Sequence, residues 1–409
     1  MDARTAETAR ADVIVVGAGF AGMYAHLRLR EVGLSAIGID AADDVGGTWW
    51  WNRYPGARCD ILSTDYSYSF DPDLEQDWDW SERYATQPEI LRYAAHVADR
   101  FDLRREVRFS TRVTAASWDD DALTWTVTTD HGDRFTAEFL IMAVGALSSA
   151  NRPAIEGLDT FSGEVHHTGQ WPHGGVDVHG KRVAVIGTGS SGIQSIPLLA
   201  RDAASLTVFQ RTPAFTVPAR NAPLDPEAIA QLKARYREHR ALQRESYGGT
   251  VSTQPTQSAH EVDADERERT FDRIWESGTL FGFLGSYNDV MIDPTANEIV
   301  ADYVRRRIRA IVHDPETAER LCPTSYPIGA KRLCLDTDYY ETYNRSNVSL
   351  VDLRETPIEC VTPTGIRTTD TEREFDVIVL ATGFDAMTGP LLGPEISGVG
   401  GRSLRDAWS

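Results

Sequence analysis

The sequence feature that most constrains the fold is a glycine pattern that occurs twice, each time after a short apolar run rich in β-branched residues. The pattern is Gly-x-Gly-x-x-Gly, and its two copies comprise Gly17, Gly19, Gly22 and Gly187, Gly189, Gly192. The runs before them, residues 11–16 and 182–186, have the composition of buried parallel strands. After such a strand the first glycine permits a tight turn, the second lets a pyrophosphate approach the backbone, and the third lets the next helix pack closely. The sequence therefore predicts an α/β chain with two dinucleotide-binding, Rossmann-like domains.

The two copies differ at the end of the next predicted strand, where a dinucleotide ribose binds. Asp40 stands there after the first copy, and Gln210 followed by Arg211 stands at the equivalent place after the second. An acidic residue accepts hydrogen bonds from a free ribose 2′-hydroxyl, whereas an arginine accommodates a 2′-phosphate. We therefore expect the first site to bind FAD and the second to bind NADPH.

Changes in texture along the chain predict its domains. These are a first part of the FAD-binding domain in residues 1–147, an NADPH-binding domain in 148–375, and an incomplete return to the FAD-binding domain in 376–409. The charged stretch at about 221–325 predicts a helical insertion in the second domain, with helices at 226–244 and 297–312 and a polar loop at 246–269. The insertion is expected either to shape a substrate cavity or to serve only as a lid or spacer.

Several local patterns predict individual elements. Thr86 and Glu89 form a capping box at the start of a helix. The runs 107–115, 123–129 and 134–144 predict strands, the last two joined as a hairpin. Because residues 139–145 are apolar on both faces, this segment is expected to re-enter the main sheet.

Charge and cysteine usage exclude several classes of partner. There are 61 acidic and 41 basic residues, for a net charge of −20, which disfavours nucleic acid and anionic membranes as partners. The polar residues 1–10 do not resemble a secretory signal, and no apolar run is long enough to span a bilayer. The four cysteines lack C-x-x-C or Cys/His metal-ligand spacing, so we expect no metal site and a reducing, cytoplasmic location.

Two further segments contain candidate site residues but leave alternatives open. Residues 43–60 hold two adjacent glycines and three consecutive tryptophans, which could wall a flat ring system or form an aromatic surface loop. Asp60 at the end of that segment has no signal of its own. The adjacent cations Lys331 and Arg332 are, by sequence alone, more typical of a solvated pair.

The segment FSGEVHHTGQWP, residues 161–172, lies between the two glycine patterns and matches Phe-x-Gly-x-x-x-His-x-x-x-Trp-Pro. Its matching residues are Phe161, Gly163, His167, Trp171 and Pro172. With GGTWWWNRYPGARCD, GTGSSGIQS, IGAKRLCLDTDYYETYNR and VLATGFDAMTG, nearly the whole chain resembles the Baeyer–Villiger monooxygenases, a class B flavin monooxygenase family. The chain is most similar to the phenylacetone and steroid monooxygenase branch.

The resemblance implies roles for individual residues. Arg332 is implied to be the catalytic arginine and Asp60 the carboxylate that pairs with it, which reverses the expectation of a solvated pair. Lys331 and Arg211 are implied to hold the NADPH 2′-phosphate, and His167 and Trp171 to couple the two domains. The full set of expected cofactor-binding residues is Gly17, Gly19, Gly22, Asp40, Gly47, Thr48, Trp49, Asp60, Gly187, Thr188, Gly189, Ser190, Ser191, Gly192, Gln194, Arg211, Thr212, Lys331 and Arg332.

The resemblance also implies a reaction. NADPH reduces FAD, O₂ adds to the reduced flavin to give a C4a-peroxyflavin, and a ketone is converted to an ester or lactone. The branch suggests a bulky, aryl or steroid-type ketone without naming it, and the sequence leaves the oligomeric state open. Arg332 is expected to stabilise negative charge on oxygen, because a guanidinium stays protonated.

The chain departs from the family after the ATGFD segment, where members typically continue and this chain stops at Ser409. We favour a fragment of an active enzyme over a shorter enzyme that leaks hydrogen peroxide or an inactive nucleotide-binding remnant. Three other functions are alternatives: an N- or S-hydroxylating flavin monooxygenase, a disulfide reductase and a non-catalytic nucleotide sensor. The disulfide reductase is disfavoured because this sequence lacks a redox cysteine pair.

Overall fold

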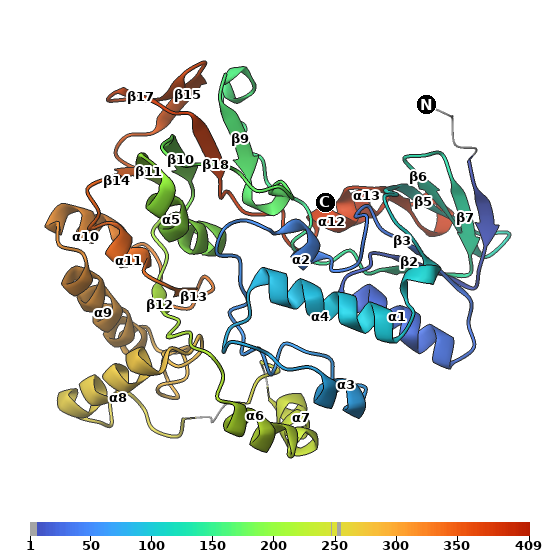
Figure 1. The fold of residues 1–409 in the computed structure, drawn as a ribbon, viewed down its shortest axis with the longest axis horizontal. Coiled ribbons are helices and arrows are strands. Elements are labelled where there is room, and N and C mark those ends of the chain that lie inside the picture. Colours follow the sequence, from blue (N-terminus) through green and yellow to red (C-terminus); the bar gives the residue numbers. More distant parts are fainter. Residues whose placement is uncertain (1–5, 247, 252–254) are drawn as a thin grey trace.

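The computed structural model describes residues 6–246, 248–251 and 255–409, so the first residues of the predicted polar N-terminus and part of the predicted loop at 246–269 lie outside the description (Figure 1). Two parallel sheets dominate the described chain. The first has the order β4-β3-β2-β8, with β2 at Val13–Val16, β3 at Ala36–Ile39, β4 at Val107–Arg108 and β8 at Phe139–Met142. The second has the order β14-β11-β10-β18-β9, with β9 at Glu164–His167, β10 at Arg182–Ile186, β11 at Ser205–Gln210, β14 at Val348–Asp352 and β18 at Val377–Leu380.

Each glycine pattern joins the central strand of one sheet to a helix. The first runs from the end of β2 into α1, Phe20–Glu31, and the second from the end of β10 into α5, Ser190–Asp202. All four residues of β2 are buried, as a strand covered on both faces requires. The predicted α/β class with two Rossmann-like units is therefore confirmed, while the predicted domain boundaries stay a prediction.

A third sheet brings distant parts of the chain together beside the first. Its order is β1-β7-β6-β5-β19, with β1 at Thr8–Arg10, β5 at Val113–Asp119, β6 at Thr124–Thr129, β7 at Arg134–Ala137 and β19 at Glu395–Ser397. β6 and β7 pair antiparallel, as the predicted hairpin requires. β19 pairs parallel with β5, so the last part of the chain lies against the N-terminal part (Figure 1).

Helices and small sheets complete the described structure. Around the first sheet lie α2 at Thr48–Trp51, α3 at Pro72–Asp77 and α4 at Gln87–Arg100. The stretch after β11 contributes α6 at Pro226–Lys233, α7 at Tyr236–Glu245, α8 at Ala264–Ser277, α9 at Pro294–Ile311, α10 at Pro315–Leu321 and α11 at Tyr339–Thr342. Strands β12, Thr216–Pro218, and β13, Cys334–Asp336, pair with each other, and β15, Ile358–Thr362, β16, Gly365–Thr368, and β17, Glu372–Glu374, form an antiparallel sheet. The last helices are α12 at Gly389–Leu392 and α13 at Leu404–Trp408, and single 3-10 turns cover Arg104–Glu106, Leu158–Thr160, Thr168–Gln170 and Val399–Gly401.

The helices of the insertion fall into two groups (Figure 1). α8 and α9 lie beneath the second sheet, and their aromatic residues join its core cluster. α6 and α7 instead lie beside α3, where the guanidinium of Arg240 donates to Glu75 at 2.7 Å and to Ser67 at 2.6 Å. Within the described residues, no helix is both long and apolar enough to cross a bilayer.

Two predicted strands were wrong in their extent. The run 107–115 is interrupted at Ser110, whose φ of +51° turns the chain, so β4 and β5 belong to different sheets. The run 134–144 likewise divides into β7 and β8. β8 does re-enter the main sheet, but as an edge strand whose Phe139 and Ile141 are 57% and 36% exposed.

One helix, one loop and one capping-box prediction also need correction. The helix predicted at 226–244 is two helices. α6 ends at Lys233, whose ammonium donates to Gln76 and Asp79, and the chain then turns into α7, which buries Arg240. The described end of the predicted loop at 246–269 contains the start of α8. The capping box at Thr86 is absent: the Glu89 carboxylate accepts hydrogen bonds from the backbone and hydroxyl of Ser81 instead.

Candidate active site

An ion pair joins two segments that are remote in the sequence. The Arg332 guanidinium donates from Nε to Oδ2 of Asp60 at 2.7 Å and from Nη2 to Oδ1 at 2.8 Å. This two-point geometry is the strong form of an arginine–carboxylate contact. The Arg332 side chain is 54% exposed and that of Asp60 is 22% exposed, so the pair borders solvent. Hydrogen bonding to Asp60 raises the pKa of Arg332, which therefore stays charged.

The backbone around Asp60 is fixed by neighbours on both sides. A turn begins at Tyr54, whose carbonyl accepts a hydrogen bond from the Ala57 amide at 3.0 Å. The Cys59 amide then donates to the Ala85 carbonyl at 3.0 Å, in the segment that leads into α4. These contacts leave the Asp60 carboxylate at the end of a tethered segment, directed at Arg332.

The same turn is attached to α5 of the second Rossmann unit. The Tyr54 hydroxyl donates to Oε1 of Gln194 at 2.8 Å, and Nε2 of Gln194 donates to the Arg58 carbonyl at 3.2 Å. Gly56, with φ +82°, packs so closely that an added Cβ would lie 2.3 Å from the Gln194 carbonyl oxygen. Burial raises the pKa of Tyr54 to about 12, so its hydroxyl keeps its proton. Gln194, expected to bind cofactor, is engaged with this turn.

The loop before β13 carries Lys331 and Arg332 and lies beside the segment that carries Arg211 and Thr212. The parallel pairing of β12 with β13 holds the two segments together. The Lys331 ammonium lies 4.7 Å from the centre of the Tyr326 ring, whose hydroxyl donates to the Pro213 carbonyl at 2.9 Å. Arg211 and Lys331 are both exposed, so their charges are accessible to a ligand. Sequence reasoning missed Tyr326, for which an aromatic residue near the two cations was the only available signal.

The first and third glycines of both patterns show why no side chain is tolerated. Gly17 and Gly187 have φ of +108° and +110°, and an added Cβ would lie 2.3 and 2.4 Å from carbonyl oxygens of the chain beside them. An added Cβ on Gly22 or Gly192 would lie 1.8 or 2.4 Å from the carbonyl oxygen of the first glycine. Both turns are thus closed around backbone and end at a helix N-terminus, which favours a pyrophosphate.

The second glycines have different surroundings. An added Cβ on Gly189 would meet no atom within 4 Å, so the backbone there is open to a ligand. Gly19 faces Gly47, whose Cα would lie 3.3 Å from such a Cβ. Gly47 adopts φ +55° and precedes α2. The residues at both patterns therefore fit a dinucleotide, and a place for Gly47 in the first site stays a prediction.

Asp40 lies at the end of β3 and contacts the first glycine turn. Its Oδ2 accepts from the Ala18 amide at 2.5 Å and its Oδ1 from the Ala42 amide at 2.7 Å. Burial raises the pKa of Asp40, and the hydrogen bonds from these two amides offset part of this increase. Each carboxylate oxygen retains a second lone pair, so Asp40 fits the hydroxyls of an FAD ribose.

The tryptophan run forms the short helix α2, which begins at Thr48. Trp49 is buried, and its indole N–H donates to the Tyr66 hydroxyl at 3.0 Å. Its carbonyl accepts from the Gln87 side chain at 2.5 Å. A helix separates the three rings, which explains how they avoid packing on one strand face. Contact of Thr48 and Trp49 with a flavin stays a prediction.

Three small polar residues lie within the second pattern, between its glycines. The Thr188 hydroxyl donates to the Thr212 carbonyl at 3.2 Å, and the Ser190 hydroxyl lies 3.2 Å from the Cys334 sulfur. Ser191 follows at the start of α5. These contacts bring the second glycine turn to the segments that carry Arg211 and Arg332.

The FSGEVHHTGQWP segment lies where the two Rossmann units are connected. At the end of β9, Nδ1 of His167 accepts from the Gly169 amide at 2.9 Å, and its ring lies 6.0 Å from that of Phe384. The chain at 149–151 pairs there with the chain at 383–385, and both are connections between the units. Burial lowers the pKa of His167, so its ring is neutral.

The remaining residues of that segment are structural in their contacts. Trp171 is 4% exposed, and Phe161 packs against the core of the second sheet. An added Cβ on Gly163 would lie 2.4 Å from the Asp376 carbonyl oxygen, and Pro172 accepts from the Gly175 amide at 3.0 Å. Coupling of the units by His167 and Trp171 stays a prediction.

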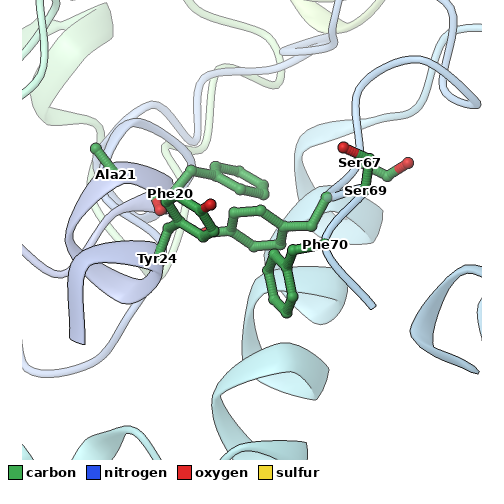
Figure 2. A pocket seen from close by; sticks show the side chains of 7 residues that line it. Phe20, Ala21, Tyr24, Ser67, Ser69 and Phe70 are labelled. Carbon is green, nitrogen blue, oxygen red and sulfur yellow. Dashed lines mark hydrogen bonds between the residues drawn. The ribbon is translucent and has the colours of Figure 1, made fainter. Parts of the chain in front are cut away.

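Two hollows of the described surface are lined by residues other than Asp60 and Arg332. One, of about 380 Å³, is lined by Phe20, Tyr24 and Phe70, whose side chains gather together, with Ser67 and Ser69 apart from them (Figure 2). The other, of about 390 Å³, lies between residues 62–64 and α6. The first hollow borders the start of α1, where Phe20 and Ala21 belong to the first glycine pattern and Tyr24 follows it.

One group of potential metal ligands is present in the described residues. His260, Asp289 and Asp293 place ligand atoms within 4.8 Å of one another. Asp293 caps α9 by accepting from the Thr295 amide at 2.8 Å, and Asp289 accepts from the Ala259 amide at 3.0 Å. These hydrogen bonds account for the two carboxylates locally.

Known proteins of similar sequence and structure cover nearly the whole chain. The pyridine nucleotide-disulphide oxidoreductase family matches residues 14–278. A Baeyer–Villiger monooxygenase of Pseudooceanicola batsensis is 44% identical over 403 residues, covering 97% of this chain and 73% of that protein. A phenazine N-monooxygenase of Lysobacter antibioticus is 44% identical over 400 residues, covering 97% of this chain and 73% of that protein.

The similarity extends to solved structures. An oxidised steroid monooxygenase bound to NADP superposes with a TM-score of 0.94 at 55% identity, covering 98% of this chain and 76% of that chain. The four cysteines of the present chain are free, so no disulfide accompanies the match to the oxidoreductase family. The chain therefore belongs to the pyridine nucleotide-disulphide oxidoreductase family and, within it, to the Baeyer–Villiger monooxygenases, flavin enzymes that use NADPH and O₂.

Proposed function

We propose that Arg332 and Asp60 form the catalytic centre at which this chain oxidises ketones to esters or lactones. The observation that carries the proposal is their two-point ion pair, at 2.7 and 2.8 Å, between a turn attached to α5 and the loop that carries Lys331. Asp60 follows the segment that contains Gly47, and Arg332 lies in the loop beside Arg211, so the position of the pair between these segments supports a catalytic role.

The two glycine turns support the placement of the cofactors. FAD is proposed to bind at the first turn with Asp40, Gly47, Thr48 and Trp49, and NADPH at the second turn. When bound, FAD would pass electrons from NADPH to O₂, so that one oxygen atom of O₂ enters the ketone and the other leaves as water. The NADPH 2′-phosphate is assigned to Arg211, Thr212 and Lys331, whose segments are held together by β12 and β13.

Arg332 has two tasks in this proposal. Its permanent positive charge stabilises the negative charge that develops on the carbonyl oxygen when the ketone is attacked, and its donors orient that oxygen. Asp60 holds the guanidinium plane by both Nε and Nη2, which leaves the remaining N–H groups free to donate. Because the pair borders solvent, substrate must exclude water before this charge becomes fully effective.

The substrate class is proposed from similarity. The 55% identity to a steroid monooxygenase favours a bulky or aryl ketone. The N-oxidising relative gives a reason to include a nitrogen heterocycle in any product assay. We expect ester from the ketone and little N-oxide.

The test is ester formed per NADPH consumed by the FAD-loaded protein and its Arg332 variants. Arg332→Ala is expected to lower the rate of ester formation on the order of 10²–10³-fold, the cost of removing a donor to a developing oxyanion. Arg332→Lys keeps the charge but loses the planar two-point contact, so its rate is expected to lie between those of the parent protein and Arg332→Ala. An Arg332→Ala variant that forms ester within threefold of the parent rate would refute the assignment.

A further inference from the structure

The segment that carries Lys331 and Arg332 depends on contacts outside itself for its position. Residues 323–333, between α10 and β13, form neither helix nor strand, apart from a turn in which the Ala330 amide donates to the Pro327 carbonyl at 3.1 Å. Ile328 and Leu333 are 1% and 2% exposed, whereas Lys331 and Arg332 between them are exposed. Two buried anchors thus hold a segment whose functional side chains face solvent.

Asn297, in the first turns of α9, holds the first anchor. Its Oδ1 accepts from the Ile328 amide at 3.1 Å, and its Nδ2 donates to the Ile328 carbonyl at 2.8 Å. The same Nδ2 donates to the Val290 carbonyl at 3.1 Å. Asn297 therefore satisfies both backbone groups of one buried loop residue and uses both of its own amide hydrogens.

The energetic weight of this contact follows from burial. Asn297 is 7% exposed and Ile328 is 1% exposed, so water cannot replace the lost partners in place. A buried backbone group left without a partner is destabilising, and removing Asn297 would leave three such groups unpaired. Without Asn297, we expect the loop to shift so that water can hydrogen-bond to these backbone groups.

A second contact from the same helix supports the loop further back. Nη1 of Arg305 donates to the Pro323 carbonyl at 3.2 Å. Gly329, with φ +92°, packs against Leu284 and Met291, which an added Cβ would approach to 3.0 and 3.2 Å. α9 therefore holds the loop at Pro323 and Ile328 while the residues before α9 support its turn.

We propose that Asn297 is a positioning residue that sets the placement of Lys331 and Arg332 through Ile328. The insertion then serves as the frame of the catalytic loop, which goes beyond the alternatives of cavity wall, lid or spacer. The inference rests on the proposed roles of Lys331 and Arg332 in binding NADPH and in ketone oxidation. It does not require Asn297 to touch substrate or cofactor.

The test compares Asn297→Leu with Tyr303→Phe in the FAD-loaded protein. Leucine has the same number and branching of side-chain heavy atoms as asparagine but cannot hydrogen-bond. Tyr303 lies on the same helix, and its hydroxyl donates to Asp272 at 2.7 Å, away from the loop. Asn297→Asp, which keeps the acceptor for the Ile328 amide and loses both donors, is measured as well in case the leucine variant does not fold.

Two readouts separate positioning from general stability. Hydrogen exchange of the amides of residues 328–333 is expected to be at least about tenfold faster in the Asn297 variants and unchanged in Tyr303→Phe. A tenfold faster exchange corresponds to a fall of roughly 1.4 kcal/mol in the free energy of local opening. The ratio of kcat/KM with NADPH to that with NADH is expected to fall toward the value for Lys331→Ala. A ratio is independent of the fraction of folded enzyme. The double variant of Asn297 and Lys331 should not lower the NADPH-to-NADH ratio below that of Lys331→Ala alone.

Exchange at 328–333 that matches the Tyr303→Phe control overturns the inference. So does faster exchange with an unchanged NADPH preference, provided that Lys331→Ala itself lowers that preference. If Lys331→Ala has no effect, the proposed role of Lys331 fails instead. The inference about Asn297 then stands only if both exchange and ester formed per NADPH change in its variants.

Discussion

Replacing Gly56 by alanine tests how tightly the Asp60 turn is fixed against α5. Gly56 has φ +82°, and an alanine Cβ there would lie 2.3 Å from the Gln194 carbonyl oxygen and 3.1 Å from Cδ1 of Leu198. The first neighbour is backbone of a buried helix, so it cannot rotate away. The turn itself must move.

The size of the movement follows from these contacts. Ordinary van der Waals contact begins at 3.4 Å, so the turn must withdraw by about 1 Å, which would stretch the 2.8 Å Tyr54–Gln194 hydrogen bond. Asp60 lies in the same tethered segment and would move with it. A misplacement of about 1 Å can cost up to about 10²-fold in rate, and the left-handed backbone adds about 1–2 kcal/mol of instability. We expect kcat/KM for ketone to fall roughly 10- to 100-fold.

The assay is ester formation together with thermal unfolding, with Gly132→Ala as the matched control. Gly132 has φ +80°, but an added Cβ would meet no atom within 4 Å, so this variant carries the backbone cost without the collision. Gly132→Ala should lose stability and keep its activity. Equal activity of the Gly56 and Gly132 variants would refute the argument that the turn sets the position of Asp60.

Three further predictions concern charge and burial. Burial raises the pKa of Asp336 from 3.8 to about 6, so between these pH values the folded state favours the neutral carboxyl group. The free energy of unfolding should therefore fall by roughly 3 kcal/mol as pH rises through this range. Asp336→Asn should remove that fall, as denaturation measured at pH 4 and pH 7 would reveal. Arg211→Ala should raise KM for NADPH about tenfold and leave KM for NADH unchanged in steady-state assays, since a 2′-phosphate contact is absent from NADH; an equal rise for both would contradict its assignment. Thiol labelling in the native state should modify Cys360, which is half-buried, before Cys59, whose pKa burial raises to about 12, as peptide mass mapping would reveal.

The parallel sheets could be predicted from sequence because their signal is local. A buried β-branched run, three glycines and a helix lie within one continuous stretch, and each glycine has a steric reason to be there. The errors arose where neighbouring elements decide the outcome. Ser110 turns the chain between two sheets, and Glu89 finds Ser81 instead of the helix start, and neither event leaves a local pattern.

The site shows the same division. Asp60 and Arg332 were expected to pair only because the chain resembles a known family, since nothing in either neighbourhood indicates the other. The contacts that position them, Tyr54 with Gln194 and Asn297 with Ile328, were not predicted at all. Each contact joins segments that are distant in the sequence. The two hydrogen bonds of Asn297 are made to the backbone of Ile328, which any residue could provide.

The measurement that tests the central claim most directly is the fate of labelled oxygen. The FAD-loaded protein is supplied with NADPH, an aryl ketone and ¹⁸O₂, and the products are analysed by mass spectrometry. We expect one ¹⁸O atom in each ester molecule and one NADPH consumed per ester. NADPH consumption that yields hydrogen peroxide and no labelled ester would contradict ketone oxidation by this chain.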